Sequence, residues 1–463
     1  MDILDRNSNI LVVGLGMITG VSTSNFLVKE GFNVYVSDIK PEEELREEKN
    51  RLDERVRVLA GDQSQSILDK GFDLIVISPG VPNEIPLIQA AKDRGIEIIA
   101  EIELAYRYLQ GRIIAITGTD GKSTTTTLVG EILKGIGLDT HIGGNLGTPM
   151  ISFTKDTKND SLSVVELSSF QLENIVGFKP DVAGILNVSP DHLDRYKGMD
   201  EYFEAKLRIS MNQIEEDFFI YNNNDKLLAR GLGGIKAKKL RFSLSDNGAD
   251  AFYKQDSIFI KLNDRIERVL DISRMQIYGM HNIENAMAAI LMVSSIMEKM
   301  NYDLDVDLIA ETCYSFKGLP HRMEVLGEYE GRRFINDSKA TTVGAVEMAL
   351  KSIPDSGILI LGGRTKGDDY TRLKGSIKSK IRHLMLIGES SSEFEKLFKD
   401  LPYSISESID EAVRGAMRAS MEGDVILLSP ACASYDMFKS YEERGDQFVK
   451  SFKKLQNGEL SWM

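Results

Sequence analysis

The chain has 463 residues, and at ~150 residues per domain this length predicts three domains rather than one. Hydrophobic residues make up 42% and charged residues 27%, which excludes a disordered or fibrous class. The net charge of -14 opposes binding to nucleic acid and to anionic membranes, so we expect neither as a partner.

Short runs of Val, Ile and Leu recur along the chain, and each is followed by a glycine-containing turn and a helical stretch. This order is typical of parallel βαβ units. The predicted strands are Ile10–Val13, Leu74–Ile77, Ile113–Ile116, Val164–Leu167, Ile358–Leu361 and Val425–Leu428. Strands that are apolar throughout are buried on both faces by helices. The predicted fold class is therefore α/β.

Three domains are predicted from changes in the character of the sequence. A new strand begins after residues 104–111, and another change falls at residues 317–320. We place the domains at residues 1–103, 104–318 and 319–463. Between Phe242 and Val269, short polar and apolar stretches alternate, which predicts an antiparallel hairpin appended to the central sheet.

A glycine-rich turn, Gly14 to Gly20, follows the first predicted strand, and Asp38 ends the second. Such a turn is typical of dinucleotide-binding folds, in which the pyrophosphate lies at a helix N-terminus. The spacing here is GxGxxxG, one residue longer than the dinucleotide pattern. An NAD(P)-dependent oxidoreductase is one hypothesis, but it leaves a second phosphate loop unexplained.

That second loop follows the strand Ile113–Ile116. Its backbone N–H groups can turn around phosphates, Lys122 supplies a cation, and Ser123 offers an oxygen ligand for Mg²⁺. The general pattern GxxxxGK[ST] needs glycine at position 116, where this chain has Ile116, so the loop is a shorter variant. The residues predicted to bind ATP here are Gly118, Thr119, Asp120, Gly121, Lys122, Ser123 and Thr124.

The short GTxGK[ST] loop resembles the ATP loop of the Mur ligase family. Other runs are similar to the branch of that family that adds D-glutamate: SSFQLE at 168–173, DSKAT at 337–341 and SPACAS at 429–434. The resemblance covers essentially the whole chain. It implies Rossmann-like N-terminal and C-terminal domains that flank a central, mainly parallel ATPase sheet.

The resemblance also implies a metal site. Ser123, Glu166 and His192, the last in a DHLD run, would bind Mg²⁺. Lys206, which is predicted to lie on a helix surface, would react with CO₂ and become carbamylated, because a carbamate is an anionic oxygen ligand whereas an ammonium repels Mg²⁺. Lys122, His192, Lys206 and Lys339 are the predicted catalytic residues.

Substrate contacts follow from the same resemblance. Asn282 and Asn285 would contact adenine, Arg322 the ATP phosphates, Asp337 the ribose and Lys339 a phosphate or the amino acid. The predicted contacts to the uridine nucleotide are Gly14, Thr19, Asp38, Ser78, Gly80, Asn145, Ser168 and Gln171. The predicted contacts to D-glutamate are Thr341, Lys366, Ser434 and Tyr441. Relative to the usual GLGxTG turn of the family, this chain has one inserted residue near Ile18.

The implied reaction is ATP-dependent ligation of D-glutamate to UDP-N-acetylmuramoyl-L-alanine through an acyl phosphate. A carboxylate is a poor acyl donor, and transfer of the γ-phosphoryl group of ATP activates it. A folylpolyglutamate synthase is a related alternative, but it would not be expected to have a uridine domain before the loop. A non-catalytic nucleotide-binding protein is a third, which the set of Lys122, Glu166, His192, Lys206 and Lys366 argues against.

The remaining features indicate the cellular setting. Cys313 and Cys432 do not form a CxxC or ligand spacing, so no disulfide framework is expected. Residues 1–9 are polar and acidic, where a secretory signal would need a basic and an apolar region. No apolar run approaches the ~18 residues of a membrane span. We expect a cytoplasmic protein and take it to be a monomer.

Overall fold

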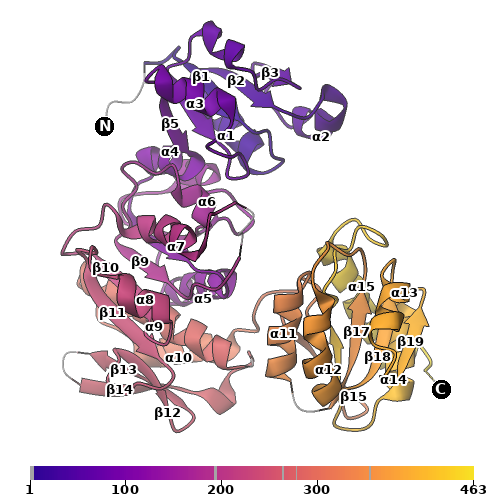
Figure 1. The fold of residues 1–463 in the computed structure, drawn as a ribbon. Coiled ribbons are helices and arrows are strands. Elements are labelled where there is room, and N and C mark those ends of the chain that lie inside the picture. Colours follow the sequence, from indigo (N-terminus) through magenta and orange to yellow (C-terminus); the bar gives the residue numbers. More distant parts are fainter. Residues whose placement is uncertain (1–4, 192–194, 263–264, 278, 354–355, 463) are drawn as a thin grey trace. The chain divides into compact units, whose positions relative to one another are not determined.

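The computed structural model describes residues 5–191, 195–262, 265–277, 279–353 and 356–462 (Figure 1). The chain divides into two compact units. The first comprises Met1–Ser273 with Ile283–Cys313, and the second comprises Arg274–Asn282 with Tyr314–Met463. The described residues form three sheets of five, nine and six strands, and each sheet falls inside one of the three predicted domain ranges. The domain boundaries themselves stay a prediction.

The five-stranded sheet has the order β3-β2-β1-β4-β5, and all its pairs are parallel. Its strands are β1 (Asn9–Val13), β2 (Asn33–Asp38), β3 (Arg57–Ala60), β4 (Leu74–Ile77) and β5 (Glu97–Ala100). Its helices are α1 (Thr19–Lys29), α2 (Arg46–Lys49) and α3 (Pro86–Asp93). The strand order reverses between β1 and β4, and open α/β sheets bind ligands at the carboxyl end of such a point.

Helix α4 (Glu101–Tyr108) leads into the nine-stranded sheet, whose order is β14-β13-β12-β11-β10-β9-β6-β8-β7. The strands are β6 (Arg112–Thr117), β7 (Thr140–Gly144), β8 (Leu162–Glu166), β9 (Val182–Ile185), β10 (Phe218–Asn222), β11 (Lys238–Ser243), β12 (Ala251–Lys254), β13 (Ser257–Leu262) and β14 (Arg265–Asp271). Strand β13 pairs antiparallel with β12 on one side and with β14 on the other. This arrangement confirms the predicted antiparallel addition to the central sheet.

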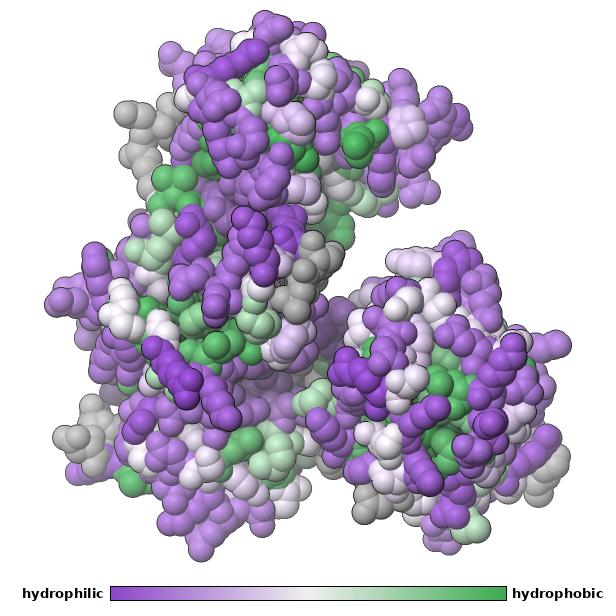
Figure 2. All heavy atoms as spheres, viewed as in Figure 1, coloured by the Kyte–Doolittle hydropathy of each residue, from purple (hydrophilic) through white to green (hydrophobic). Residues whose placement is uncertain are grey.

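Helices connect and cover this central sheet. They are α5 (Lys122–Gly135), α6 (Ser169–Leu172), α7 (Met199–Leu207), α8 (Lys226–Gly231), α9 (Met280–Met300) and α10 (Val306–Ser315). Among the described residues, no helix is both long and apolar enough to span a membrane. Hydrophilic residues cover most of the face seen in Figure 2, and hydrophobic ones form smaller groups.

The six-stranded sheet has the order β15-β16-β20-β17-β18-β19, with only the β15–β16 pair antiparallel. Its strands are β15 (Glu324–Tyr329), β16 (Arg332–Asn336), β17 (Gly357–Gly362), β18 (Ile381–Ile387), β19 (Tyr403–Ser406) and β20 (Val425–Leu428). Its helices are α11 (Val343–Ser352), α12 (Lys374–Lys380), α13 (Ser391–Leu397), α14 (Ile409–Ala419) and α15 (Tyr441–Gln456). Alternate residues of β17 enter different apolar cores, so both faces are covered.

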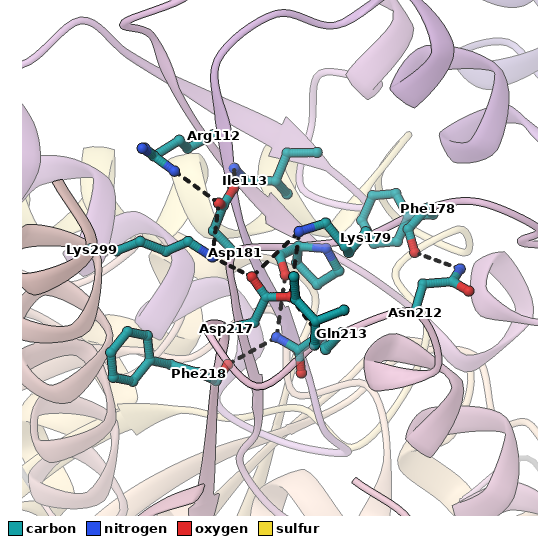
Figure 3. Close-up of polar contacts among 12 residues, drawn as sticks. Arg112, Ile113, Phe178, Lys179, Asp181, Asn212, Gln213, Asp217, Phe218 and Lys299 are labelled. Atoms are coloured by element: carbon teal, nitrogen blue, oxygen red, sulfur yellow. Dashed lines mark hydrogen bonds and ion pairs between the residues drawn. The ribbon is translucent and has the colours of Figure 1, made fainter. Parts of the chain in front are cut away.

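A buried ion-pair network closes the amino edge of the central sheet (Figure 3). The Asp217 carboxylate is fully buried and contacts the ammonium groups of Lys179, at 3.4 Å, and of Lys299. Lys299 also lies 3.2 Å from Asp181, which pairs with Arg112 at 3.1 Å. Arg112, Asp181 and Asp217 lie at the amino ends of β6, β9 and β10, and Lys299 lies near the C-terminal end of α9. The network therefore contributes to stability at the edge opposite the phosphate loop.

Candidate active site

The phosphate loop joins β6 to α5, as predicted. The backbone N–H groups of Thr119 and Asp120 donate to Asn187 Oδ1 at 3.0 and 2.8 Å, and Asn187 Nδ2 donates to Asp120 O at 3.1 Å. Asn187 follows β9, the strand beside β6. A side chain from the neighbouring strand therefore fixes the loop. Sequence reasoning assigned Asn187 no role, because an Asn after a strand is common in loops.

Gly121 cannot be replaced without strain. Its φ is +80°, and a Cβ there would overlap Asn285 Oδ1. Thr125 Oγ1 also donates to Asn285 Oδ1, at 3.3 Å. The structure thus places Asn285, a predicted adenine contact, directly against the start of α5. In the same helix Ser123 is buried and Thr124 is half-buried.

Two lysine side chains meet at one carbonyl of the loop. Lys122 Nζ and Lys206 Nζ both donate to Gly118 O, at 3.0 and 2.7 Å. Lys206 is only 1% exposed, and its ammonium lies 4.4 Å from the centre of the Tyr202 ring. Burial, and after it the charge of Lys122, lowers the pKa of Lys206 to about 7. The prediction of a surface lysine is therefore wrong, because α7 turns Lys206 inward.

Glu166 ends β8, the strand on the other side of β6, in register with Ile116. Its Oε1 accepts from Asn145 Nδ2 at 2.9 Å. Its Oε2 is buried and has no hydrogen-bond partner among the described residues. An unpaired, buried carboxylate oxygen is costly unless a cation or water meets it. The Glu166 carboxylate therefore fits a cation site beside the loop.

The rest of the predicted metal set is less complete. His192 lies outside the described residues. Within the described part of the chain, no group of three or more His, Cys, Asp and Glu side chains could hold a metal ion. The metal-binding roles of Ser123, Glu166, His192 and carbamylated Lys206 stay predictions.

Ser168 and Gln171 form a capping box at the start of α6. Ser168 Oγ accepts from the backbone of Gln171 at 3.3 Å, and Gln171 Oε1 accepts from the backbone of Ser168 at 3.0 Å. A helix of only four residues needs such a cap, because its first N–H groups have no partner inside the helix. This local role accounts for the two side chains, and their contact with a sugar nucleotide stays a prediction.

The glycine turn lies at the carboxyl ends of β1 and β4. The backbone of Leu15 donates to Asp38 Oδ2 at 2.7 Å, and Ser78 Oγ donates to Gly14 O at 2.7 Å. The structure thus brings three predicted uridine-binding residues together at the topological switch point. Thr19 begins α1, and the exposed Gly80 follows β4. Ile18, next to the insertion, is 54% exposed, so the loop accommodates the extra residue on the solvent side.

In the second unit, two of the residues predicted to bind D-glutamate are in contact with each other. Lys366 Nζ donates to Thr341 Oγ1 at 3.1 Å. Ser434 is buried in the loop that follows β20, the strand between β16 and β17. Tyr441 begins α15, and the Lys339 ammonium lies 5.1 Å from the centre of its ring. The three loops that follow these strands therefore supply all the residues predicted to bind D-glutamate except Tyr441.

Among the residues of this unit that are predicted to bind the nucleotide, Asp337 has hydrogen-bond partners within the protein. Asp337 accepts from Ser429 Oγ at 2.8 Å and from the backbone of Met323 at 3.2 Å. Burial raises the pKa of Asp337 to about 7. Arg322 lies just before β15, and Asn282 is buried in the first turn of α9.

Arg444 is a structural residue that sequence reasoning missed. It is 1% exposed, and it donates to Ser338 Oγ at 3.0 Å, to Ser338 O at 2.8 Å and to Cys432 O at 3.1 Å. Arg444 thereby ties the loop after β16 to the loop after β20. Burial lowers its pKa to about 10. In the sequence it stands among charged residues of an amphipathic helix, where a solvated arginine is the usual expectation.

Comparison with protein families accounts for all three sheets. The Mur ligase MurD-like N-terminal domain matches residues 8–100, the Mur ligase middle domain residues 116–293, and the Mur ligase glutamate ligase domain residues 321–432. The chain belongs to the Mur ligase family. Two relatives with the name UDP-N-acetylmuramoylalanine--D-glutamate ligase are similar to this Mur ligase over nearly their whole length. The relative from Alkaliphilus oremlandii is 41% identical, with 96% of this chain and 97% of the relative covered. The one from Geotalea uraniireducens is 42% identical, with 98% of each covered.

Solved structures share the fold of this Mur ligase. The UDP-N-acetylmuramate-alanine ligase MurC from Thermotoga maritima superposes with a TM-score of 0.58 at 18% identity, over 97% of this chain and 100% of that one. The MurF ligase from Thermotoga maritima in complex with ADP superposes with a TM-score of 0.57 at 17% identity, over 91% of this chain and 95% of that one. These similarities confirm the predicted α/β architecture.

Proposed function

We propose that this Mur ligase joins D-glutamate to UDP-N-acetylmuramoyl-L-alanine in peptidoglycan precursor synthesis, with conversion of ATP to ADP and phosphate. The observation that carries the proposal is the 41% identity, over 96% of the chain, to a ligase with that name. The contact between Lys366 and Thr341 supports it, because an ammonium and a hydroxyl suit a side-chain carboxylate. Neither an oxidoreductase nor a folate ligase would account for that full-length match.

The first step of the proposed reaction transfers the γ-phosphoryl group of ATP to the alanyl carboxylate. The loop Gly118–Ser123 binds phosphate oxygens through its backbone, and Lys122 neutralises their charge. Arg322 is the second cation proposed to contact the ATP phosphates. The neutral glutamate amine then attacks the acyl carbon, and a C–N bond forms. Phosphate leaves with the C–O bond electrons, and the nitrogen loses a proton to give the amide.

Glu166, Ser123 and His192 are the proposed ligands for Mg²⁺, which when bound would neutralise phosphate charge. The unpaired Glu166 Oε2 supports this role. The ammonium of Lys206 first loses a proton, and the neutral amine then attacks the carbon of CO₂. An N–C bond forms, one C–O π pair moves onto oxygen, and the nitrogen releases a second proton, so a carbamate anion replaces the original cation. The near-complete burial of Lys206 supports this modification, because a buried ammonium is costly.

Substrate specificity is assigned to the remaining predicted residues. Asn282 and Asn285 bind adenine, Asp337 the ribose and Lys339 a phosphate. Thr341, Lys366, Ser434 and Tyr441 bind D-glutamate. The uridine nucleotide lies against the turn at Gly14, and the domain ranges 1–103, 104–318 and 319–463 bind the uridine, ATP and glutamate groups respectively. A cytoplasmic monomer stays the expectation.

Phosphate release by the purified chain tests the proposal. We expect release only when ATP, Mg²⁺, UDP-N-acetylmuramoyl-L-alanine and D-glutamate are all present. Equal rates with L-glutamate, or with a folate in place of the uridine nucleotide, would overturn the proposed substrates.

A further inference from the structure

Glu173, the last residue of the SSFQLE run, joins two parts of the first unit. Its carboxylate accepts from Tyr196 Oη at 2.7 Å and from Arg195 at 2.9 Å, both from the loop before α7. It also accepts from Asn83 Nδ2 at 2.9 Å. Asn83 lies in the loop after β4, in the five-stranded sheet. A carboxylate of the central sheet region therefore holds a loop of the N-terminal sheet.

Arg195 reinforces the same junction. Its guanidinium lies 4.3 Å from the centre of the Phe170 ring in α6, and its N–H groups donate to the carbonyls of Pro79 and Val81, each at 3.4 Å. The side chains of Arg195 and Glu173 are each 17% exposed. Because these two side chains are mostly buried and make several hydrogen bonds, their positions are more restricted than those of an exposed ion pair.

The position of this junction connects it to the substrate. Pro79 and Val81 flank Gly80 in the turn that begins at Ser78, and Ser78 Oγ holds the carbonyl of Gly14. On the other side, α6 follows directly on β8, which ends at Glu166. The junction thus fixes the glycine turn relative to the edge of the central sheet that carries the phosphate loop. A long substrate that contacts both the glycine turn and this edge of the central sheet binds well only when the distance between them is right.

We propose that Glu173 and Arg195 are positioning residues that set the span between the uridine end and the acyl end of the nucleotide sugar substrate. This inference rests on the proposed function. It makes a specific claim about binding: breaking the pair weakens a ligand that reaches both sheets and leaves unchanged a ligand that reaches only the glycine turn. A pair that served stability alone would affect both ligands equally, through loss of folded protein.

A matched control exists in the same unit. Lys155 donates to Glu30 at 2.9 Å, and this pair also joins the central part to the five-stranded sheet. Glu30 follows the C-terminal end of α1, so the pair lies at the amino edge of that sheet, far from the glycine turn. Lys155→Met removes one connection between the same two parts without changing the turn.

Calorimetric titration of the full chain with UDP and with UDP-N-acetylmuramoyl-L-alanine tests the proposal. For Glu173→Gln and Arg195→Met we expect binding of the full nucleotide sugar to weaken by roughly tenfold, and binding of UDP to change by less than about twofold. Lys155→Met should change neither.

Equal weakening of both ligands, or a change no larger than that of Lys155→Met, would overturn the positioning role. Thermal unfolding of each variant shows whether binding weakens because less protein is folded or because the glycine turn and the central sheet are no longer held at the right distance. The proposed function is tested separately by the wild-type chain: if it binds the nucleotide sugar but ligates no D-glutamate, the ligase assignment fails while the binding comparison still decides the role of Glu173 and Arg195.

Discussion

Lys366 and Thr341 stand 25 positions apart in the sequence, and a hydrogen bond of 3.1 Å joins their side chains. The contact forms because the loops after β16 and β17 flank the same neighbouring strand, β20. An exposed lysine is normally hydrated, so a hydroxyl that holds its ammonium in one place supports the proposed site for a carboxylate.

Lys366→Ala should therefore raise the Michaelis constant for D-glutamate by ~10- to 100-fold, because a charged partner of the substrate carboxylate is lost. The Michaelis constant for ATP should change little. Lys374→Ala, which removes an exposed lysine of the same sheet region, is the control. Equal weakening of ATP and glutamate would assign Lys366 to the phosphates instead.

Under the proposed carbamate role, Lys206→Ala should lower turnover by ~100-fold or more, since loss of groups that support a metal site has large effects. Since Lys206 is buried, some loss of stability is also expected, and the melting temperature must be measured alongside. Short carboxylic acids should partly restore turnover, because their oxygens can stand in for the carbamate. Turnover near the wild-type level without any added acid would show that no carbamate is needed.

Glu101 should make stability depend on pH. Its carboxyl group is buried, with Oε1 accepting from the backbone of Ile151 at 2.7 Å, and burial raises its pKa from 4.5 to about 7. A raised folded-state pKa gives stability that is fully present below the unfolded pKa and is lost as pH rises through about 7. The melting temperature should fall between pH 5 and pH 8.

Glu101→Gln cannot ionise and should reduce that fall, by an amount equivalent to ~1–3 kcal/mol. The measurement is the difference in melting temperature between the two pH values, for wild type and variant. A difference of the same size in both proteins would show that other groups control the pH dependence.

Lys299→Met should destabilise the protein by ~2–4 kcal/mol, because it leaves the fully buried Asp217 with one cation fewer (Figure 3). Lys179 remains near the carboxylate, which limits the loss. The control is Lys238→Met: its pair with Glu298 is 53% and 61% exposed, and such pairs contribute ~0–1 kcal/mol. Chemical denaturation that gave equal losses for both variants would contradict the structural role of the network.

Much of the fold could be predicted because strands and loops depend on local pattern. Five of the six predicted strands lie inside observed ones, and the sixth overruns β8 only by Leu167. The phosphate loop was predictable because its residue types follow from local requirements: the positive φ at Gly121 favours glycine, and Lys122 supplies a cation for phosphate. The assignment of Lys366 and Thr341 to one site followed only from the family resemblance, since residues on separate loops give no periodic signal, and the contact between their side chains was not predicted.

The burial of Lys206 and Arg444 could not be predicted from their neighbours. Both stand on helices rich in charged residues, where solvent exposure is the usual outcome. Their partners, Gly118 and Ser338, are distant in the sequence. Tertiary packing decides such positions. The S-x-x-Q spacing of Ser168 and Gln171 is that of a capping box, whereas the family resemblance implies a contact with the substrate.

The most direct test is mass spectrometry of the product after the wild-type chain is incubated with ATP, Mg²⁺, UDP-N-acetylmuramoyl-L-alanine and D-glutamate. We predict a new species with the mass of the starting nucleotide plus glutamate minus water, formed together with an equal amount of ADP. ADP formed without that species, or the same species formed equally well from L-glutamate, would contradict the assignment of this chain as a D-glutamate ligase.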